Sequence, residues 1–307
     1  MPEAPSVTVI GSLNQDIVLS VPSIPRPGET LLASRLETHP GGKGGNQAVA
    51  AARAGARVRM IARVGDDDAG RRLLASLARE GIDALTCATL NGVPTGQAFI
   101  PVAANGENCI IVAPGANARL HPDDLDLSDL HAAVTILQLE IPLETVLHAT
   151  RLARATGACV ILNAAPAATL APELLEGVNV LVVNETEAEA LCGAPVNGLA
   201  DAPGAARLLA APGRAVVITL GARGAYWLDG NLDGVQPAFP VEPVDTTAAG
   251  DAFVGALAVA LAEGATLAGA VRRGCAAGAI TATRHGAQPS LPSRAEIDAL
   301  AGPPENS

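Results

Sequence analysis

Short apolar runs alternate with longer amphipathic stretches along most of the chain. Residues 6–11 (SVTVIG) form a β-branched run that ends at a glycine, which is typical of a buried strand. Residues 46–55 (NQAVAAARAG) predict a helix that begins with Asn46 as its N-cap and ends at a glycine. We expect a strand over 57–65 and then a helix over 66–81, whose first turn carries aspartates.

The same alternation continues through the rest of the chain. Strands are predicted at 133–140, 158–166, 179–184 and 215–221, and helices at 143–157, 248–264 and 267–286. Strands that are apolar throughout and separated by helices are typical of a parallel sheet covered on both faces. The sequence therefore predicts an α/β fold with a central, mostly parallel sheet.

Two stretches, about 14–40 and 94–113, break this alternation. Both contain Pro or Asn-Gly turn signals between apolar runs and predict hairpins. We interpret them as one small antiparallel sheet that projects from the main domain as a lid; ordinary surface hairpins are the alternative, and the pattern does not decide between them. No repeat or low-complexity linker divides the chain, so residues 1–307 are interpreted as a single domain.

Composition narrows the classes of partner. The 307 residues are 49% hydrophobic and carry a net charge of −11, and only 2% are aromatic. An acidic surface with few aromatic side chains disfavours binding to nucleic acid or to anionic membranes. No stretch resembles a secretory signal or a membrane span, and the five cysteines show no C-x-x-C spacing. We therefore expect a cytoplasmic protein with reduced thiols.

A glycine-rich segment, HPGGKGGNQA, contains Lys43, the only lysine in the chain. Gly44 follows this lysine where a Walker-type phosphate loop needs Ser or Thr, so that loop is excluded. The G-x-G-x-x-G dinucleotide fingerprint and the G-x-S-x-G hydrolase motif are also absent. A loop around a small ligand and a flexible turn both remain compatible with this segment.

A second small-residue segment, VDTTAAGDAFVG, leads into an apolar helix with Asp251 in its first turn. The free amides and the dipole at such a helix start favour an anion. An aspartate there fits a general base beside an oxyanion pocket. It also fits a residue that only complements the helix dipole, which the local sequence taken alone favours.

Polar side chains follow several predicted strands. Asn14 and Asp16 follow the first strand, Glu140 ends another, and Asn184 with Glu187 follows a third. Ligands of open parallel sheets bind beyond the carboxyl ends of the strands. Each residue alone is a common turn or cap former, but together they suit a hydroxyl-rich ligand with hydrated Mg²⁺.

These segments together resemble the ribokinase branch of the PfkB-type carbohydrate kinase family over nearly the whole chain. The resemblance is carried by GSLNQD, PRPGET, GGKGGNQAVAAARAGA, GDDDAG, LQLEIPLE, NETEAE, ITLGARG, VDTTAAGDAFVGAL and TRHGAQPS. It implies a ribokinase-like α/β fold with a β-sheet lid and a homodimer formed through the lids. It also implies transfer of the γ-phosphoryl group of ATP to O5 of D-ribose.

The resemblance also implies roles for individual residues. Asp251 would be the base, and the amides of Ala248, Ala249, Gly250 and Asp251 the anion hole. The sugar pocket would contain Asn14, Asp16, Gly42, Lys43, Asn46 and Glu140. The nucleotide would contact Asn184, Thr219, Gly221, Arg223, Gly224, Gly250 and Cys275. Asn184 and Glu187 would order Mg²⁺ through water, and an activating K⁺ would be held by Asp245, Thr247, Thr281, Arg284, Gly286 and Ser290.

Three positions depart from the family pattern. Cys275 stands where members often carry a histidine near the adenine, Thr247 replaces a bulkier aliphatic residue, and Gly45 stands where Ala is common. Kinases for deoxyribose, fructose or adenosine are the alternative, but the second hairpin has only Phe99 to stack on a base. A non-catalytic sugar sensor would be expected to have lost Gly250 or Asp251.

Overall fold

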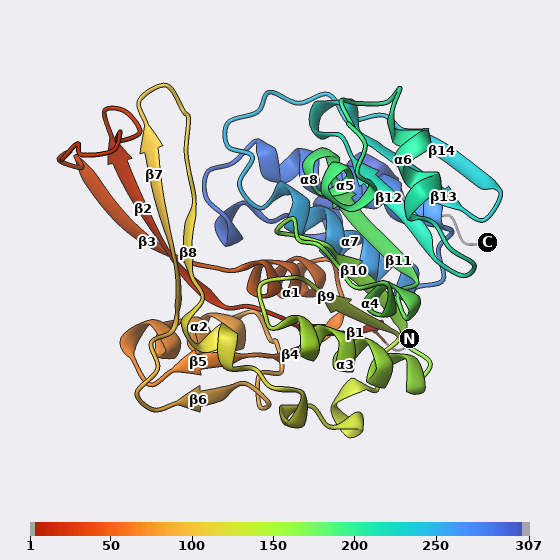
Figure 1. Cartoon of the computed structure of the whole chain (residues 1–307), viewed down its shortest axis with the longest axis horizontal. Coiled ribbons are helices and arrows are strands. Elements are labelled where there is room, and N and C mark those ends of the chain that lie inside the picture. The colour runs from red at the N-terminus through yellow and green to blue at the C-terminus, as the bar shows by residue number, and fades with distance from the viewer. Residues whose placement is uncertain (1–3, 303–307) are drawn as a thin grey trace.

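The structure, a computed structural model, describes residues 4–302, and a twisted sheet of eight strands forms the centre of this part of the chain (Figure 1). In spatial order the strands are β14 (Leu232–Gln236), β13 (Ala225–Asp229), β12 (Ala215–Thr219), β11 (Val180–Asn184), β10 (Cys159–Asn163), β9 (Val134–Leu137), β1 (Ser6–Ile10) and β4 (Arg57–Ile61). The strands from β12 to β4 run parallel, while β13 and β14 pair antiparallel at one edge.

Helices cover both faces of this sheet. One core contains buried residues of α1 (Lys43–Arg53), α2 (Asp68–Arg79), α7 (Ala249–Ala262), α8 (Leu267–Ala282) and α9 (Arg294–Ala301). The other contains residues of α3 (Leu143–Ala155), α4 (Pro172–Glu176), α5 (Glu185–Cys192) and α6 (Ala202–Leu209). Short 3₁₀ turns are η1 (Gly115–Arg119), η2 (Pro122–Asp124), η3 (Leu127–Leu130), η4 (Gly221–Arg223) and η5 (Gln288–Ser290).

Each apolar strand contributes side chains to both hydrophobic cores. In β12, Ala215 and Val217 enter the core under α7 and α8, and Val216 and Ile218 enter the opposite one. Successive side chains of a strand point to opposite faces, so a strand buried on both faces must be apolar throughout. The predicted α/β class with a mostly parallel sheet is therefore confirmed.

A separate sheet stands beside this body, at the left of Figure 1. Its strands, in order, are β3 (Arg35–Gly41), β2 (Asn14–Val21), β7 (Gly96–Ala103) and β8 (Ile111–Ala113). Each hairpin is antiparallel, as expected, but β2 and β7 pair in parallel, so the sheet is mixed rather than wholly antiparallel. The two hairpins associate through their first strands, which leave the main body in the same direction.

Several boundaries differ from the sequence prediction: the helix expected over 267–286 ends at Ala282, and the strand expected over 133–140 ends at Leu137. The predicted strand 57–65 is divided, because β1 ends at Ile10 and offers no partner beyond Ile61; β5 (Arg63–Gly65) then pairs with β6 (Ala88–Leu90). The helix expected to begin at Asn46 begins at Lys43 instead, with Gly42 as its N-cap at φ 85°. Asn46 lies inside the first turns, and its side chain is used elsewhere.

Within residues 4–302, no helix is long and apolar enough to cross a lipid bilayer.

Candidate active site

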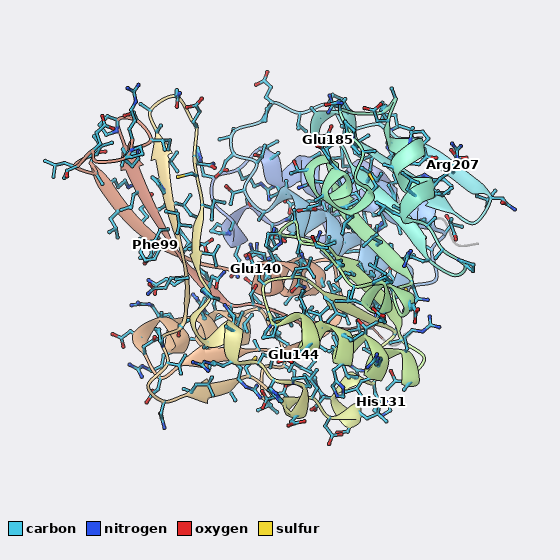
Figure 2. All side chains as sticks on the ribbon, in the orientation of Figure 1. Phe99, His131, Glu140, Glu144, Glu185 and Arg207 are labelled. Carbon is cyan, nitrogen blue, oxygen red and sulfur yellow. The ribbon has the colours of Figure 1, made fainter. Side chains whose placement is uncertain are left out.

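The predicted polar residues gather at the carboxyl ends of the central strands. Strand order reverses between β1 and β9, because the chain passes first to β4 on one side and later to β9 on the other. Such a reversal opens a crevice in which ligands of α/β proteins bind. Figure 2 labels Glu140, which follows β9, near the base of the small sheet. Asn14, at the start of β2, follows β1 on the other side of the crevice.

Asp251 lies in the first turn of α7 and is buried, with 7% of its surface exposed. Its Oδ2 accepts a hydrogen bond from Asn46 Nδ2 at 2.9 Å, and its Oδ1 accepts one from Gln47 Nε2 at 2.9 Å. Burial raises the pKa of Asp251, although the charge of Lys43 and the two amides favour the ionised form. The result is a buried, oriented carboxylate with spare lone pairs, as a general base requires.

Lys43, at the start of α1, supplies the positive charge of the crevice. Burial alone would lower the pKa of this lysine, but the carboxylates of Asp251, Glu140 and Glu187 raise it above its ordinary value. The side chain is therefore an ammonium ion at neutral pH. It lies in the field of carboxylates that come from three different segments of the chain.

The start of α7 has the geometry of an anion pocket. Ala248, its N-cap, has φ 61° and ψ 8°, and within residues 4–302 it is the one non-glycine residue with a positive φ. Backbone strain of this kind clusters at ligand sites. A Cβ placed on Gly250 would meet no atom within 4 Å, so the space beside it is open. The Ala249 N–H already donates to the Thr246 carbonyl at 3.2 Å, whereas the amides of Gly250 and Asp251 lack intrahelical acceptors and can donate to an anion there.

The end of the crevice near the small sheet holds two further carboxylates. Glu140 Oε2 accepts hydrogen bonds from Ser12 Oγ at 2.5 Å and from the backbone N–H of Lys43 at 3.1 Å. Asp16 is buried, and burial followed by the charges of Glu140 and Asp251 raises its pKa to about 7. Both groups are suited to accept hydrogen bonds from hydroxyl groups.

Two glycines make this end of the crevice compact. A Cβ on Gly42 would lie 2.7 Å from the backbone nitrogen of Asn14, and the residue has a φ of 85°. A Cβ on Gly41 would lie 2.1 Å from Asp16 Oδ2. Larger residues would therefore displace the polar groups around the ligand space.

Asn184 and Glu187 form a capping box at the start of α5. Asn184 Oδ1 accepts from the Glu187 N–H, and Glu187 Oε2 accepts from the Asn184 N–H, both at 2.8 Å. Burial raises the pKa of Glu187, while Lys43 opposes that shift. Glu187 Oε1 remains able to accept from metal-bound water. Within residues 4–302, no three His, Cys, Asp or Glu side chains gather as direct metal ligands, so a Mg²⁺ ion here would keep several water ligands.

Most residues predicted for the nucleotide lie at or just beyond the ends of β11 and β12, while Gly250 lies in α7 and Cys275 in α8. Thr219 ends β12, and η4 with its flanking glycines follows it. Arg223 pairs with Glu185, which connects this turn to the start of α5. Cys275 is buried in α8, and burial raises the pKa of its thiol to about 12. Cys275 packs in the hydrophobic core with residues of α7 and α8.

The segments predicted to hold a monovalent cation are tied together by Asp245. Its Oδ1 accepts from the Thr247 N–H and its Oδ2 from the Gly286 N–H, both at 2.9 Å. Burial opposes ionisation, but these bonds lower the pKa of Asp245. Thr281 Oγ1 is buried without a partner, and Ser290 Oγ donates to the Ala287 carbonyl. Arg284 pairs with Glu296 through its side chain, so only its carbonyl can face the site. A charged carboxylate with hydroxyl and carbonyl oxygens fits a hard cation such as K⁺.

Sequence reasoning missed three buried residues that support this crevice. Gln47 contacts Asp251, Ser12 contacts Glu140, and Asn117 contacts Asn14. Asn117 Oδ1 accepts from the Leu13 N–H at 2.9 Å, and its Nδ2 donates to Asn14 Oδ1 at 2.7 Å. Their only signal in the sequence is that each is a polar residue inside or beside an apolar stretch.

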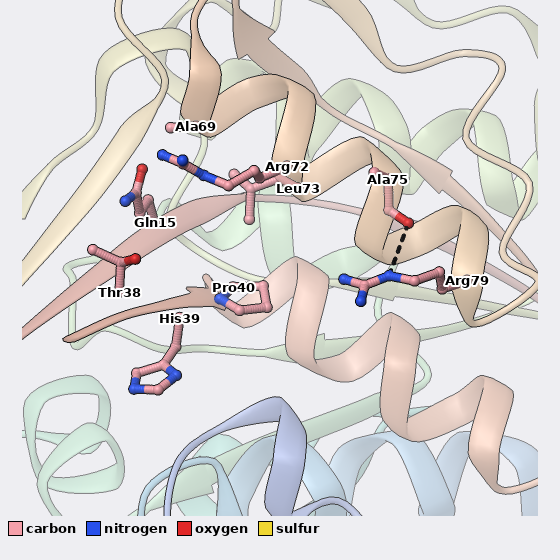
Figure 3. A pocket seen from close by; sticks show the side chains of 9 residues that line it. All are labelled: Gln15, Thr38, His39, Pro40, Ala69, Arg72, Leu73, Ala75 and Arg79. Carbon is pink, nitrogen blue, oxygen red and sulfur yellow. Dashed lines mark hydrogen bonds between the residues drawn. The ribbon is translucent and has the colours of Figure 1, made fainter.

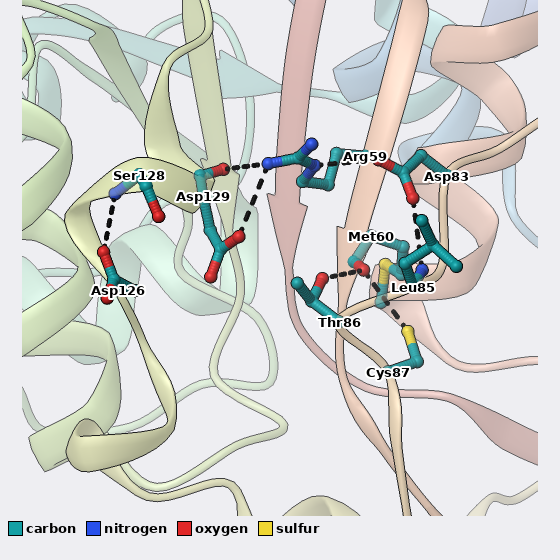
Figure 4. Close-up of polar contacts among 9 residues, drawn as sticks. All are labelled: Arg59, Met60, Asp83, Leu85, Thr86, Cys87, Asp126, Ser128 and Asp129. Atoms are coloured by element: carbon teal, nitrogen blue, oxygen red, sulfur yellow. Dashed lines mark hydrogen bonds and ion pairs between the residues drawn. The ribbon is translucent and has the colours of Figure 1, made fainter.

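Two hollows lie away from the crevice. One, of about 200 Å³, is lined by Gln15, Thr38, His39, Pro40, Ala69, Arg72, Leu73, Ala75 and Arg79 (Figure 3). Gln15 alternates with Asn14 and Asp16, so this hollow lies under the other face of the small sheet. The second, of about 240 Å³, lies at the amino ends of β1 and β4. Beside it, Arg59 joins Asp83 and Asp129 (Figure 4). Neither hollow contains Asp251 or its neighbours.

Comparisons with known proteins agree with this geometry. The family description "pfkB family carbohydrate kinase" matches residues 4–294. A ribokinase of Haemophilus influenzae is 42% identical, covering 95% of this chain and 96% of that one. A deoxyribokinase of Salmonella typhi is 37% identical over 94% of this chain and 95% of its own. The structure of Arabidopsis thaliana ribokinase complexed with ribose and ATP superimposes with a TM-score of 0.89 at 31% identity, covering 97% and 99% of the two chains. The chain belongs to the pfkB family of carbohydrate kinases.

Proposed function

We propose that the protein transfers the γ-phosphoryl group of ATP to O5 of D-ribose. The observation that carries this proposal is the Asp251 carboxylate, buried and held by Asn46 and Gln47 at the open start of α7. The similarity to ribokinases over nearly the full chain, one of them complexed with ribose and ATP, supports the choice of substrates. Neither similarity assigns a role to any residue of this chain.

The reaction follows from the charges around Asp251. The proton of the sugar hydroxyl passes to the Asp251 carboxylate, the hydroxyl oxygen bonds to the γ-phosphorus, and the bond from that phosphorus to the bridging oxygen of ADP breaks. The amides of Gly250 and Asp251 and the dipole of α7 stabilise charge on the transferred group. Lys43 adds a full positive charge. Phosphoryl transfer depends mainly on such positioning and charge stabilisation.

We propose that amide groups of fixed orientation in the sugar pocket form hydrogen bonds with the hydroxyl groups of the sugar. Asn14 Oδ1 already accepts from Asn117, so Asn14 presents its NH₂ group as a donor. Asn46 Nδ2 already donates to Asp251, and its buried Oδ1 has no partner, so Asn46 presents an acceptor. Asp16 and Glu140 provide carboxylate acceptors, and Gly42 keeps the backbone close.

ATP would lie along Thr219, Gly221, Arg223 and Gly224, with its phosphates toward Gly250 and Asn184 and its base toward Cys275. Mg²⁺, held through water by Asn184 and Glu187, would neutralise phosphate charge. K⁺, held by the oxygens of Asp245, Thr247, Thr281, Arg284, Gly286 and Ser290, would fix the backbone that precedes α7. In this chain, Asp245 already links that backbone to Gly286.

The small sheet is proposed to act as a lid and to pair with that of a second copy. On one face, the register places Ile17, Leu19 and Phe99 beside Leu36 and Ile111. Leu36 is 62% exposed and Ile111 is 63% exposed in the isolated chain. Apolar surface of this kind is typical of an interface between subunits.

We also place the protein in the cytoplasm, where thiols remain reduced. The five cysteines are free thiols in the structure.

The main alternative is a related sugar as substrate. The 37% identity to a deoxyribokinase favours 2-deoxyribose as the second candidate. A coupled assay of ADP formation with ribose, 2-deoxyribose, fructose and adenosine, in KCl and in NaCl, tests both. The proposal predicts the highest kcat/KM for ribose and higher rates in KCl. Equal rates on ribose and adenosine would contradict it.

A further inference from the structure

A chain of buried amides lies behind Asp251. Gln47, in α1, is fully buried and donates from Nε2 to Asp251 Oδ1 at 2.9 Å and to Asn163 Oδ1 at 3.0 Å. Asn163 ends β10, and its Nδ2 donates to the Val182 carbonyl at 3.2 Å. Gln138, just after β9, donates from Nε2 to Gln47 Oε1 at 2.6 Å. Gln47 therefore connects the Asp251 carboxylate of α7 to side chains at the ends of β9 and β10.

The donor and acceptor of each hydrogen bond that Gln47 makes in this series of amides are fixed. A backbone carbonyl only accepts, so Asn163 must turn its NH₂ group to Val182 and its oxygen to Gln47. Gln47 must then donate to Asn163, and its own oxygen accepts from Gln138. Rotating the Gln47 amide by 180° would set oxygen against oxygen at both Asn163 and Asp251. Gln47 can therefore act toward Asp251 only as a donor.

Gln47 differs in this respect from Asn46, the other donor to Asp251. Asn46 has a buried Oδ1 without a partner, so its amide has an unused group on the ligand side. Gln47 has partners for its oxygen and for both of its hydrogens. Arrival of a sugar can change the contacts of Asn46, whereas those of Gln47 are already complete.

We propose that Gln47 is a positioning residue for the general base: it engages Oδ1 of Asp251 and leaves Oδ2, on the side of Asn46, to receive the proton. This inference rests on the proposed function, because it assumes that Asp251 is the base. Gln47 itself touches neither substrate. Asn163 acts through it, by fixing the direction of its amide, and Gln138 donates to its oxygen.

The first test is Gln47→Leu, which keeps a buried side chain of similar size but removes the donor. Misplacing a catalytic group by about 1 Å can cost about 100-fold in rate, so kcat should fall about 10–100-fold. The KM for sugar should stay within about threefold, since the amide does not face the sugar. Thr145→Val is the matched control: it also removes a buried polar group, in this case a hydroxyl that donates to the Leu120 carbonyl in the opposite core. It should leave kcat unchanged.

The second test is Gln47→Glu, which remains informative if the leucine variant does not fold. A protonated carboxyl group can still donate to Asp251, but an ionised one cannot. The variant should therefore retain much of its kcat at low pH and lose about tenfold or more as pH rises through the upper pKa of the carboxyl pair. The kcat of wild type should not fall in this way as pH rises. Other charged groups also act electrostatically on this site or its neighbours, namely Lys43, Glu140, Glu187 and Asp16. These groups are the same in wild type and in the variant.

The outcomes separate this inference from the proposed function. If wild type phosphorylates no sugar, the proposed function itself fails. If wild type is active and Gln47→Leu keeps its kcat within about threefold, only the role of Gln47 is wrong. Parallel pH profiles for wild type and Gln47→Glu would also overturn it, because a merely structural residue gives a loss that does not depend on pH.

Discussion

Asn46 Nδ2 donates to Asp251 Oδ2 at 2.9 Å, although the two residues are 205 positions apart in the chain. The bond joins the first glycine-rich segment to the helix start that faces the anion pocket. Asn46 can make it because α1 begins at Lys43, which places Asn46 inside the helix rather than at its cap. The proposed sugar pocket and the proposed anion pocket therefore meet at these two side chains.

Asn117 offers a test of how the sugar pocket is fixed. Asn117→Asp keeps the acceptor for the Leu13 N–H but loses the donor to Asn14 Oδ1 and to the Leu13 carbonyl. No hydrogen bond then holds the Asn14 amide with its NH₂ group toward the sugar. The KM for sugar should rise about tenfold, as expected when a polar contact worth about 1–3 kcal/mol is lost. Initial-rate kinetics should show kcat within about threefold of wild type. An unchanged KM would show that Asn117 is not needed to orient Asn14.

Asp16 makes the stability of the sugar-free protein depend on pH. Its pKa of about 7 lies above its ordinary value of 3.8, so the folded state binds a proton that the unfolded state releases. The resulting stability is complete below the unfolded pKa and is lost as pH rises through about 7. Each pKa unit corresponds to about 1.4 kcal/mol, so Asp16→Asn should raise the free energy of unfolding by about 2–4 kcal/mol more at pH 8 than at pH 4.

Urea unfolding of both proteins at the two pH values measures this difference. Because other buried carboxylates are common to both proteins, comparing the variant with wild type isolates Asp16. The same stabilisation at both pH values would show that Asp16 is already ionised in the folded state at low pH.

Local patterns predicted much of this molecule, because apolar runs and helix signals act over short stretches. β12 is apolar from Ala215 to Ile218 because both of its faces are buried, and Asp251 was singled out because an aspartate at this helix start fits a general base beside an anion pocket. Gln47 and Asn117 could not be found in this way. Their roles depend on contacts with residues more than 100 positions away, which no local pattern contains.

Contacts between distant segments also explain why some local structure was predicted wrongly. Each hairpin of the small sheet was predictable from its own turn, but the parallel pairing of β2 with β7 is set by how two distant segments leave the main body. Asn46 was expected to be an N-cap because its residue type favours that position. Gly42 takes that place because only the glycine fits a φ of 85° so close to Asn14.

Lys43 should matter for turnover rather than for nucleotide binding. Its charge lies among Asp251, Glu140 and Glu187, where it can stabilise the transferred phosphoryl group. Lys43→Ala should lower kcat about 100–1,000-fold, the usual effect of removing one donor to a developing charge. The Kd of ATP, measured by calorimetry, should change by less than about threefold. An unchanged kcat would show that Lys43 does not contribute to the reaction.

The small sheet should control the oligomeric state. Replacing both Leu36 and Ile111 by Asp puts charges into the proposed interface and should convert a dimer into a monomer. Leu85→Asp is the matched control, because Leu85 is 94% exposed but lies outside the small sheet. Light scattering coupled to size exclusion should give half the mass for the double variant only. A double variant with the mass of wild type would contradict pairing through this face.

Asp251→Asn tests the central claim most directly, because it keeps the shape of the side chain and removes its ability to take a proton. Its new NH₂ group can face Asn46, whose unpartnered Oδ1 can accept from it when the Asn46 amide turns. If Asp251 is the general base, kcat for ribose should fall about 100–10,000-fold. Ribose binding, measured by calorimetry, should stay within a few fold. Phosphorylation of ribose by this variant at the wild-type rate would show that the base lies elsewhere.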